Sequence, residues 1–588
     1  MNNILYIGIS KLDDMFKHFC GRSLLIAVLM MMVISPVKAL NDGRFVNQNA
    51  FIKSSGEKLF WTIDAGGQQS PTLQIISRED AKTVLNNLKI TDTSVAVELD
   101  HLSALTVTGT FTNAGSASAM RLKSNKEGTA SLIHYAENLE VNIERYIPGV
   151  RTWTGSNGID WHLISAPVGD QPIDDFTTDG ADNNYDFYGW DEAADTWRNY
   201  KSAATWDEFN DGFDFNAGQG YMVAYQQTQT FTFSGPVNVA DVVLEDLTMS
   251  GTGQPGEYGN GWHLLGNPFA SALDISQGGW VKDKMNNQIQ LWCADKGGYK
   301  AHILGEEQIG EIEDNLIPPH QGFFVRATEG GASFTIPAAA RVHGNQNVYK
   351  KDDGPIILPQ NTLYLIVEGS HNHYYDVAFV RFLDQANTGF DPKYDAHKLF
   401  GLPSRPHLYS VTAGVKYSIY SRPPSENAIQ VPVHFVKGTD QQYTMHFSGM
   451  HNFYPFREIF LDDLVTGTRT NLLLNDHYTF SAAGNFMPAR FVLVFDEIDD
   501  TTDTTEPVNI DANDDLVEIY SHEKNVYLKI PEQISGQIYV FSTKGQKIYA
   551  GSIDHGGLYV IPVNTGPGIY IIGVAGSKHN IFQKVIIE

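Results

Sequence analysis

The stretches WHLISAPV at residues 161–168 and WHLLGNPF at residues 262–269 both carry Trp-His-Leu, three further residues and a proline. Later landmarks keep the same register, with an offset that drifts only from 101 to 103 residues. Such a register, held over some 75 residues, indicates an internal duplication. The matched landmarks are Pro167 with Pro268, Trp190 with Trp292, Trp197 with Tyr299, Gly220 with Gly322, and Phe231 to Phe233 with Phe334 to Ile336.

Each copy alternates polar and apolar residues with the period of a β-strand. The stretch YDFYGWDEAADTWRNY at 185–200 places an acidic tip between two aromatic runs, which predicts a hairpin with Trp190 and Trp197 on its arms. The glycine before Tyr221 and the one before Phe323 predict a bulge or a close backbone approach. About 100 residues of this kind is the size of a β-sandwich.

The repeated Trp and Leu residues have two interpretations. The first is that two homologous domains need the same core anchors. The second is that the rings form platforms on which sugars stack, since aromatic faces suit that contact. The candidate ligand-binding residues are then Trp190, Trp197, Trp292 and Tyr299. His162 and His263 lack a second metal ligand at close spacing.

Length and composition favour a multidomain, mainly β protein. A single hydrophobic core stops growing near roughly 250–300 residues, and this chain has 588. Its mean hydropathy of −0.23, with 53 Gly and 27 Tyr, suits a globular protein of short strands and tight turns. We therefore expect tandem β-sandwich-like domains.

The N-terminal residues have the features of a secretory signal. Lys17 and Arg22 precede an apolar run at 24–34, and Val37 and Ala39 supply the small residues of a cleavage site. This predicts a signal peptide over 1–39, with Met1 and Met15 as alternative starts. No later segment is apolar for long enough to predict a transmembrane helix.

The charge balance restricts the classes of partner. A formal net charge of −27 repels phosphate backbones, so we expect no nucleic-acid binding. Cys20 lies in the predicted signal peptide, which leaves Cys293 without an internal disulfide partner.

Changes in pattern along the chain predict the remaining boundaries. Residues 40–147 have short alternating strands about ten residues apart, as in a β-solenoid or an open sheet. The repeats follow at 148–245 and 246–345, and 346–498 is a further sandwich. The acidic, Thr-rich run over 499–515 predicts a solvated linker before a last domain at 516–588.

That last domain carries a family resemblance. The strand-turn-strand around Gly545, the Gly-Gly turn at 556–557, GIYIIGV at 568–574 and the closing KVIIE together resemble a type A C-terminal sorting domain of the type IX secretion system of Bacteroidetes-type bacteria. The resemblance implies an Ig-like sandwich, the secretion machinery as the partner of 516–588, cleavage after export, and a body on the outer-membrane surface or secreted. The stretch NTGFDPKYDAHKLFG at 387–401 is similar to surface proteins with such a tail.

The chain carries only weak sequence signals for catalysis or metal binding. The chain has no GxSxG, HExxH, P-loop or dinucleotide motif. The run at 174–186 offers Ca²⁺ the oxygen ligands of Asp174, Asp175, Asp179 and Asp182, without the spacing of an EF-hand, and a solvated loop is the alternative. SHNHYYD at 370–376 predicts a polar hairpin tip or a metal site, and GEEQIGEIEDN at 305–315 predicts an acidic loop.

Two classes of function follow. The first is a non-enzymatic exported protein that binds a glycan or matrix ligand and needs no cofactor. The second is a secreted glycan hydrolase with an unrecognised carboxylate pair. Duplication favours the first, because two copies multiply weak contacts.

Overall fold

The chain folds mainly into β-strands, as expected, with short helices between them. The computed structural model describes residues 60–496 and 518–587, so the predicted signal peptide and acidic linker lie outside the described residues. Further gaps in the described ranges are 64–71, 76–82, 91–95, 114–115, 151–159, 179–183, 252–260, 277–278, 295, 306–308, 345–358, 425–428, 451–452, 454–457, 483–487, 523–524, 531–535, 543–546, 554–556, 564–567 and 577–579. Among the described residues no helix is long and apolar enough to cross a membrane.

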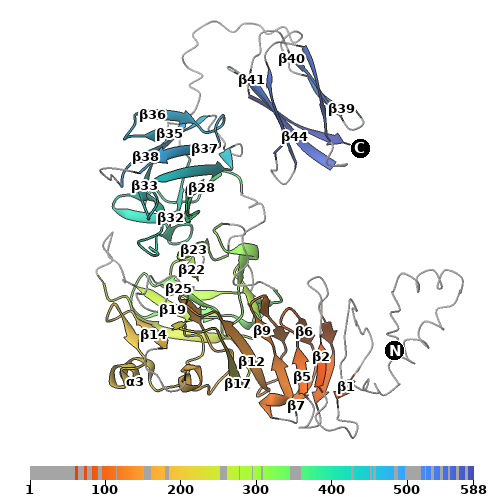
Figure 1. Ribbon diagram of the computed structural model, residues 1–588, viewed down its shortest axis with the longest axis vertical. Coiled ribbons are helices and arrows are strands. Elements are labelled where there is room, and N and C mark those ends of the chain that lie inside the picture. Colours follow the sequence, from red (N-terminus) through yellow and green to blue (C-terminus); the bar gives the residue numbers. More distant parts are fainter. Residues whose placement is uncertain are drawn as a thin grey trace, which may run out of the picture.

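The N-terminal region is a three-sided parallel solenoid (Figure 1). The chain visits three sheets in turn, and every ladder between the solenoid strands of these sheets is parallel. A small antiparallel hairpin of β9 (Ser124–Asn125) and β10 (Gly128–Thr129) forms a separate sheet. The sheets are β1 (Phe60–Ile63), β4 (Asn87–Ile90) and β7 (Phe111–Asn113); β2 (Thr72–Ile75), β5 (Ala96–Leu99) and β8 (Met120–Leu122); and β3 (Thr83–Leu85), β6 (Ala104–Val107) and β11 (Ser131–Ile133). Buried Leu and Val side chains of successive coils, such as Leu99 and Leu122, fill the interior.

The two repeats share one topology. Each has a leading strand paired with its last strand, and a four-stranded sheet of matching order. In repeat 1 these are β12 (Glu140–Ile147) with β17 (Gln229–Pro236), and β13 (His162–Ile164), β16 (Tyr221–Tyr225), β14 (Tyr185–Asp191) and β15 (Thr196–Asn199). In repeat 2 they are β18 (Val242–Leu247) with β26 (Ala332–Ile336), and β19 (Trp262–Gly266), β25 (Gly322–Arg326), β22 (Gln288–Cys293) and β23 (Gly298–Ile303).

Short elements complete the repeats. Repeat 1 carries α3 (Ala203–Asn210), whose Trp206 is fully buried. Repeat 2 adds β21 (Val281–Asp283) to the edge of β26, and a small sheet of β20 (Ala272–Asp274), β24 (Leu316–Ile317) and β27 (Arg341–Val342).

Strand β12 joins the solenoid to repeat 1. One edge of β12 pairs in parallel with β8, and the other pairs with all eight residues of β17. It is therefore both the last strand of the solenoid and the first strand of repeat 1. Likewise β18 starts repeat 2, so both leading strands begin before the boundaries expected at residues 148 and 246.

The region after repeat 2 is one strongly curved sheet of eleven strands around a single core. Its two ends meet where Tyr478 near one edge donates its hydroxyl to Asp463 near the other, at 2.9 Å. The strands are β28 (Thr362–Gly369), β29 (Tyr375–Phe382), β30 (Ala396–His397), β31 (His407–Thr412), β32 (Val415–Arg422), β33 (Ile429–Val436), β34 (Gln442–Ser448), β35 (Glu458–Asp463), β36 (Thr468–Asn471), β37 (His477–Ser481) and β38 (Phe491–Asp496). We call this part the sheet domain.

The C-terminal part has two antiparallel sheets packed over a shared core. Val526, Ile538 and Ile572 are buried between them. The three-stranded sheet is β39 (Glu518–His522), β40 (Asn525–Ile530) and β43 (Gly557–Pro562), and the other is β42 (Lys547–Ile553), β41 (Gly536–Ser542), β44 (Gly568–Gly576) and β45 (Asn580–Ile587).

Candidate functional site

The duplicated Trp-His-Leu motifs lie where the two repeats meet. The indole nitrogen of Trp190 in repeat 1 donates to the carbonyl oxygen of Trp262 in repeat 2 at 2.8 Å. In return, the indole of Trp292 in repeat 2 donates to the carbonyl oxygen of Trp161 in repeat 1 at 2.7 Å. Equivalent residues thus exchange equivalent bonds, which makes the repeats an intramolecular pair with approximate twofold symmetry.

The pseudo-twofold axis passes beside Ser165 and Gly266, which are equivalent positions. A Cβ added to Gly266 would lie 2.2 Å from Ser165 Cβ. On either side, Ile164 bridges to Gln321 and Leu265 bridges to Gln219. The close backbone approach predicted at Gly220 is confirmed, because a Cβ there would lie 2.4 Å from the carbonyl oxygen of Leu265.

Substituting Gly266 by alanine tests this axis. We expect a loss of about 1–3 kcal/mol of unfolding free energy, because the added methyl group overlaps Ser165. The exchanged pair Ser165→Gly with Gly266→Ser should recover most of that loss, since it moves the side chain across the axis. Urea denaturation of the three proteins gives the comparison, and equal losses for the single and the exchanged variant would contradict the symmetry.

The four candidate sugar platforms are part of this interface. Trp190 and Trp197 face each other across the predicted hairpin with ring centroids 5.2 Å apart, and Trp292 and Tyr299 do so in repeat 2 at 5.1 Å. All four are partly buried and pack against Leu163, Trp262, Leu264 and Phe324. Sugar stacking on these rings stays a prediction.

Two of the four candidate metal ligands already have partners within the fold. Asp174 accepts the Tyr200 hydroxyl at 2.6 Å, and Asp175 accepts the Gln171 amide at 2.8 Å. Asp179 and Asp182 lie outside the described residues. Across the described part of the chain, no three His, Cys, Asp or Glu side chains gather as a metal site would require.

The remaining histidine candidates lie apart from one another. His162 is buried, and His263 bonds the Thr248 carbonyl oxygen at 2.8 Å. His371 and His373 are exposed at the turn between β28 and β29, where His373 contacts Glu368 at 2.6 Å. The polar hairpin tip predicted at 370–376 is thus confirmed for 370–374, whereas Tyr375 and Asp376 belong to β29 and Asp376 is buried.

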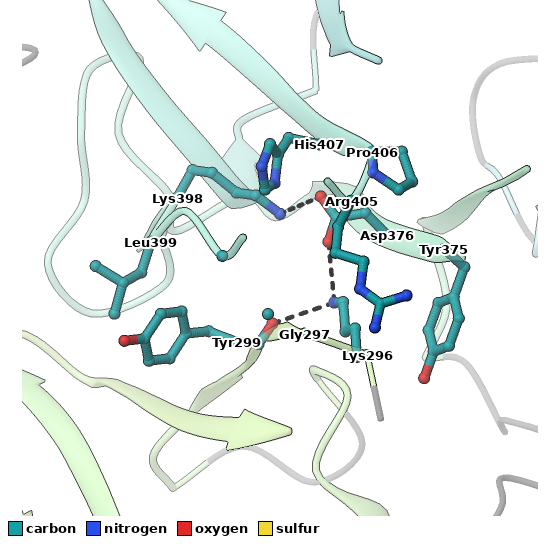
Figure 2. Close-up of a pocket in the computed structure, with 12 residues that line it drawn as sticks. Lys296, Gly297, Tyr299, Tyr375, Asp376, Lys398, Leu399, Arg405, Pro406 and His407 are labelled. Atoms are coloured by element: carbon teal, nitrogen blue, oxygen red, sulfur yellow. Dashed lines mark hydrogen bonds and ion pairs between the residues drawn. The ribbon is translucent and has the colours of Figure 1, made fainter. Parts of the chain in front are cut away.

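A second cluster joins repeat 2 to the sheet domain. We call Lys296, Glu311, Asp376 and Lys398 the junction cluster. Figure 2 shows Lys296 Nζ 3.0 Å from Asp376 Oδ1 and Lys398 Nζ in contact with Asp376 Oδ2. Lys296 Nζ also lies 2.6 Å from Glu311 Oε2. Repeat 2 supplies Lys296 and Glu311, while the sheet domain supplies the other two.

The junction cluster is buried and balanced in charge. The side chains of Lys296, Glu311, Asp376 and Lys398 are 1%, 6%, 4% and 3% exposed. Arg405, His407 and Tyr375 border them. Two cations and two carboxylates therefore neutralise each other in a buried site, so removal of one leaves a buried charge unpaired.

The pKa of Asp376 reflects this pairing. Burial alone would raise it, but the Lys398 and Lys296 ammonium groups hold it well below its usual range. The backbone N–H of Leu408 also donates to Asp376 Oδ2 at 2.7 Å. Glu311 has a raised pKa because burial outweighs its pairing with Lys296.

Sequence reasoning missed this cluster. The stretch at 305–315 was expected to be an acidic loop, and the structure buries its Glu311 under the sheet domain. Lys398 belongs to the stretch at 387–401 that is similar to surface proteins. No sequence motif connects Lys398 with Lys296 or Asp376, which lie in other parts of the chain. Charged residues that pair only across a domain interface produce no local pattern in the sequence.

Acidification should weaken this junction through His407. Burial lowers the pKa of His407 to about 4, although Asp376 partly offsets this effect. A histidine in the unfolded chain has a pKa of about 6.5, which is above that of buried His407. The contribution of His407 to the unfolding free energy is therefore complete above that pH and is lost as the pH falls towards 4, by about 3 kcal/mol in all. Burial also lowers the pKa of His134 to about 4 and that of His162 to about 3, in the same direction.

Urea midpoints measured between pH 4 and 7 check this expectation. His407→Gln should flatten the dependence, whereas the same change at exposed His371 should leave it as in the parent. Identical pH profiles for His407→Gln and the parent would contradict the assignment.

A family model matches residues 63–495, which is most of the chain. It is described as "Domain of unknown function (DUF8693)". The chain belongs to the DUF8693 family. The DUF8693 region runs from β1 into β38, so it includes the solenoid, both repeats, the sheet domain and the junction cluster. It ends before the C-terminal sandwich.

Among curated proteins, the DUF8693 chain is similar to the minor fimbrium subunit Mfa5 of Porphyromonas gingivalis. The two are 24% identical over 493 residues, which is 76% of this chain and 38% of that protein. The chain thus spans about two fifths of the length of the curated relative it matches.

The chain also has similarity to solved structures, including the following two. One is the dimeric latent PorU of Porphyromonas gingivalis, with 11% identity, 62% of this chain and 36% of that chain covered, and a TM-score of 0.11. The other is a BSP domain of a biofilm-associated protein, with 10% identity, 77% and 96% covered, and a TM-score of 0.11. At these TM-scores neither structure bears on the fold.

Proposed function

We propose that this protein is a non-enzymatic, exported cell-surface β protein that acts as a structural or adhesive subunit. The observation that carries the proposal is the match to a fimbrium subunit over 76% of this chain. The way the modules are joined supports it. A shared strand, an exchange of tryptophan bonds and a buried ionic junction connect the solenoid, the repeats and the sheet domain.

The proposed route is a cleaved signal peptide over 1–39 followed by the type IX secretion system. The resemblance of 516–588 to a sorting domain supports this route, and the two-sheet C-terminal sandwich is compatible with it. The proposed ligands are glycan or matrix molecules, bound on loops or on the partly buried aromatic rings.

Truncation tests the route. A chain that ends at Glu497 should fold normally, because the sheet domain is complete at Asp496, but it should stay in the periplasm. Protease shaving and peptide mapping of intact cells give the readout, with the full chain as the control. Arrival of the truncated chain at the surface would contradict the role of 516–588.

A binding screen tests the role of the body. Residues 40–497 are applied to glycan and matrix arrays, and hydrolysis of the same glycans is measured in parallel. We expect binding without turnover. Turnover that a single Asp or Glu substitution abolishes without unfolding would establish the hydrolase instead.

A further inference from the structure

Two members of the junction cluster are placed for a reaction with each other. Asp376 lies at the start of β29, and Lys398 directly follows β30. Both strands pair with β32, so the two side chains meet across one sheet. Lys398 Nζ contacts Asp376 Oδ2, and neither side chain is more than 4% exposed.

We propose that Lys398 Nζ and Asp376 Cγ join in an intramolecular amide bond. An amine held in direct contact with a carboxyl group has the proximity that replaces an encounter in solution. The bond would close a covalent loop from residue 376 to residue 398. The inference goes beyond the proposed function, because it holds whether the body binds or catalyses.

The neighbouring groups fit the roles that amide formation needs. Leu408 N donates to Asp376 Oδ2 at 2.7 Å, where the negative charge of a tetrahedral intermediate would develop. Lys296 Nζ lies 3.0 Å from Oδ1 and can protonate that oxygen as it leaves. Glu311 lies 2.6 Å from Lys296 Nζ and holds that proton donor in place.

The steps balance without any other reactant. A proton passes from the Lys398 ammonium group to Asp376, which leaves a neutral amine and a neutral acid. The amine attacks Cγ, the C–N bond forms, and charge gathers on Oδ2. Lys296 lends a proton to the Oδ1 hydroxyl, the C–O bond breaks, and one water molecule leaves. The new amide nitrogen gives up one proton, which restores Lys296.

The local pKa values favour the nucleophile but oppose the two proton transfers, because the pKa of Asp376 is held low by its lysines and that of Lys296, which burial alone would lower, is raised by Glu311 and Asp376. Burial lowers the pKa of Lys398, which favours its neutral and nucleophilic form. Burial also raises the pKa of Glu311, although the Lys296 ammonium group partly offsets this effect. The carboxylate of Asp376 is held charged by its cations, and the proton it needs comes from Lys398 itself.

Mass spectrometry of the full chain, purified from a heterologous host and denatured, tests the bond. We expect essentially every molecule to be lighter than its sequence by one water molecule, with the peptides that contain residues 376 and 398 recovered as one joined species. Two separate peptides at full mass would overturn the proposal. A joined species through Lys296 in place of Lys398 would also overturn it.

Variants make the assignment specific. Lys398→Arg keeps the charge but cannot form the amide, so the full mass should return, whereas Lys416→Arg should keep the loss of water. Glu311→Gln should lower the joined fraction several-fold at early times after synthesis, and an unchanged fraction would overturn the role of Glu311. Should Lys398→Arg fail to fold, the joined peptide of the parent chain still decides the question.

Discussion

Replacing Asp376 by alanine is expected to lower the unfolding free energy by about 3–5 kcal/mol, because it leaves the Lys398 ammonium group buried without a partner. The substitution removes the carboxyl group that both Lys296 and Lys398 contact, and it leaves an excess positive charge in a buried site. Urea denaturation measures the loss. Asp384→Ala is the matched control, since Asp384 is exposed in the same domain and should change stability by at most about 0.5 kcal/mol.

A charge-balanced double variant separates pairing from packing. Asp376→Leu with Lys398→Met removes one charge of each sign and leaves the Lys296 and Glu311 pair intact. We expect it to be much more stable than Asp376→Ala, because no buried charge is left without a counterion. If both proteins were equally unstable, the ionic explanation would be wrong.

Replacing Trp190 by alanine is expected to cost about 3–5 kcal/mol, the usual range for a large aromatic side chain in a packed cluster. Its ring packs against Trp197 and Phe324, and its indole N–H donates a hydrogen bond to the carbonyl oxygen of Trp262. By the pseudo-twofold symmetry, Trp292→Ala should have a similar effect. Thermal and urea denaturation of both variants give the comparison.

Phenylalanine variants isolate the hydrogen bond. Trp190→Phe and Trp292→Phe keep an aromatic ring and lose the indole N–H, so each should cost about 0.5–1.5 kcal/mol plus a packing loss smaller than that of alanine. An alanine variant no less stable than the phenylalanine variant would show that these rings do not hold the repeats together.

Local patterns predicted the secondary structure well and the tertiary partners poorly. Period-two alternation and the hairpin residues placed Trp190 opposite Trp197, because both signals act within a few residues. The sequence could not distinguish a sandwich from the single curved sheet of the sheet domain, since alternation records which face is buried and not which strands pair. The same limit left the solenoid and the open sheet as alternatives.

The interfaces were harder to predict than the cores. The duplication was visible, but Trp190 and Trp292 bond the opposite repeat, and nothing in one copy shows that its partner is the other. Glu311 had the appearance of a solvated acid because its counterion, Lys296, is not adjacent in the sequence, and Asp376, which shares that counterion, approaches only when two domains meet. Predictions from sequence thus ended where contacts depend on domain assembly.

The shared strand β12 has a consequence for the order in which the chain can mature. When the polypeptide emerges N-terminus first, β12 completes the solenoid while one of its edges is still unpaired. That edge stays unpaired until residues 229–236 have emerged and can form β17. An open strand edge is a template for pairing with other chains. A nascent chain halted before β17 is therefore the species most prone to aggregate. A factor that holds the nascent chain at this stage would improve the yield more than one that acts on the finished fold.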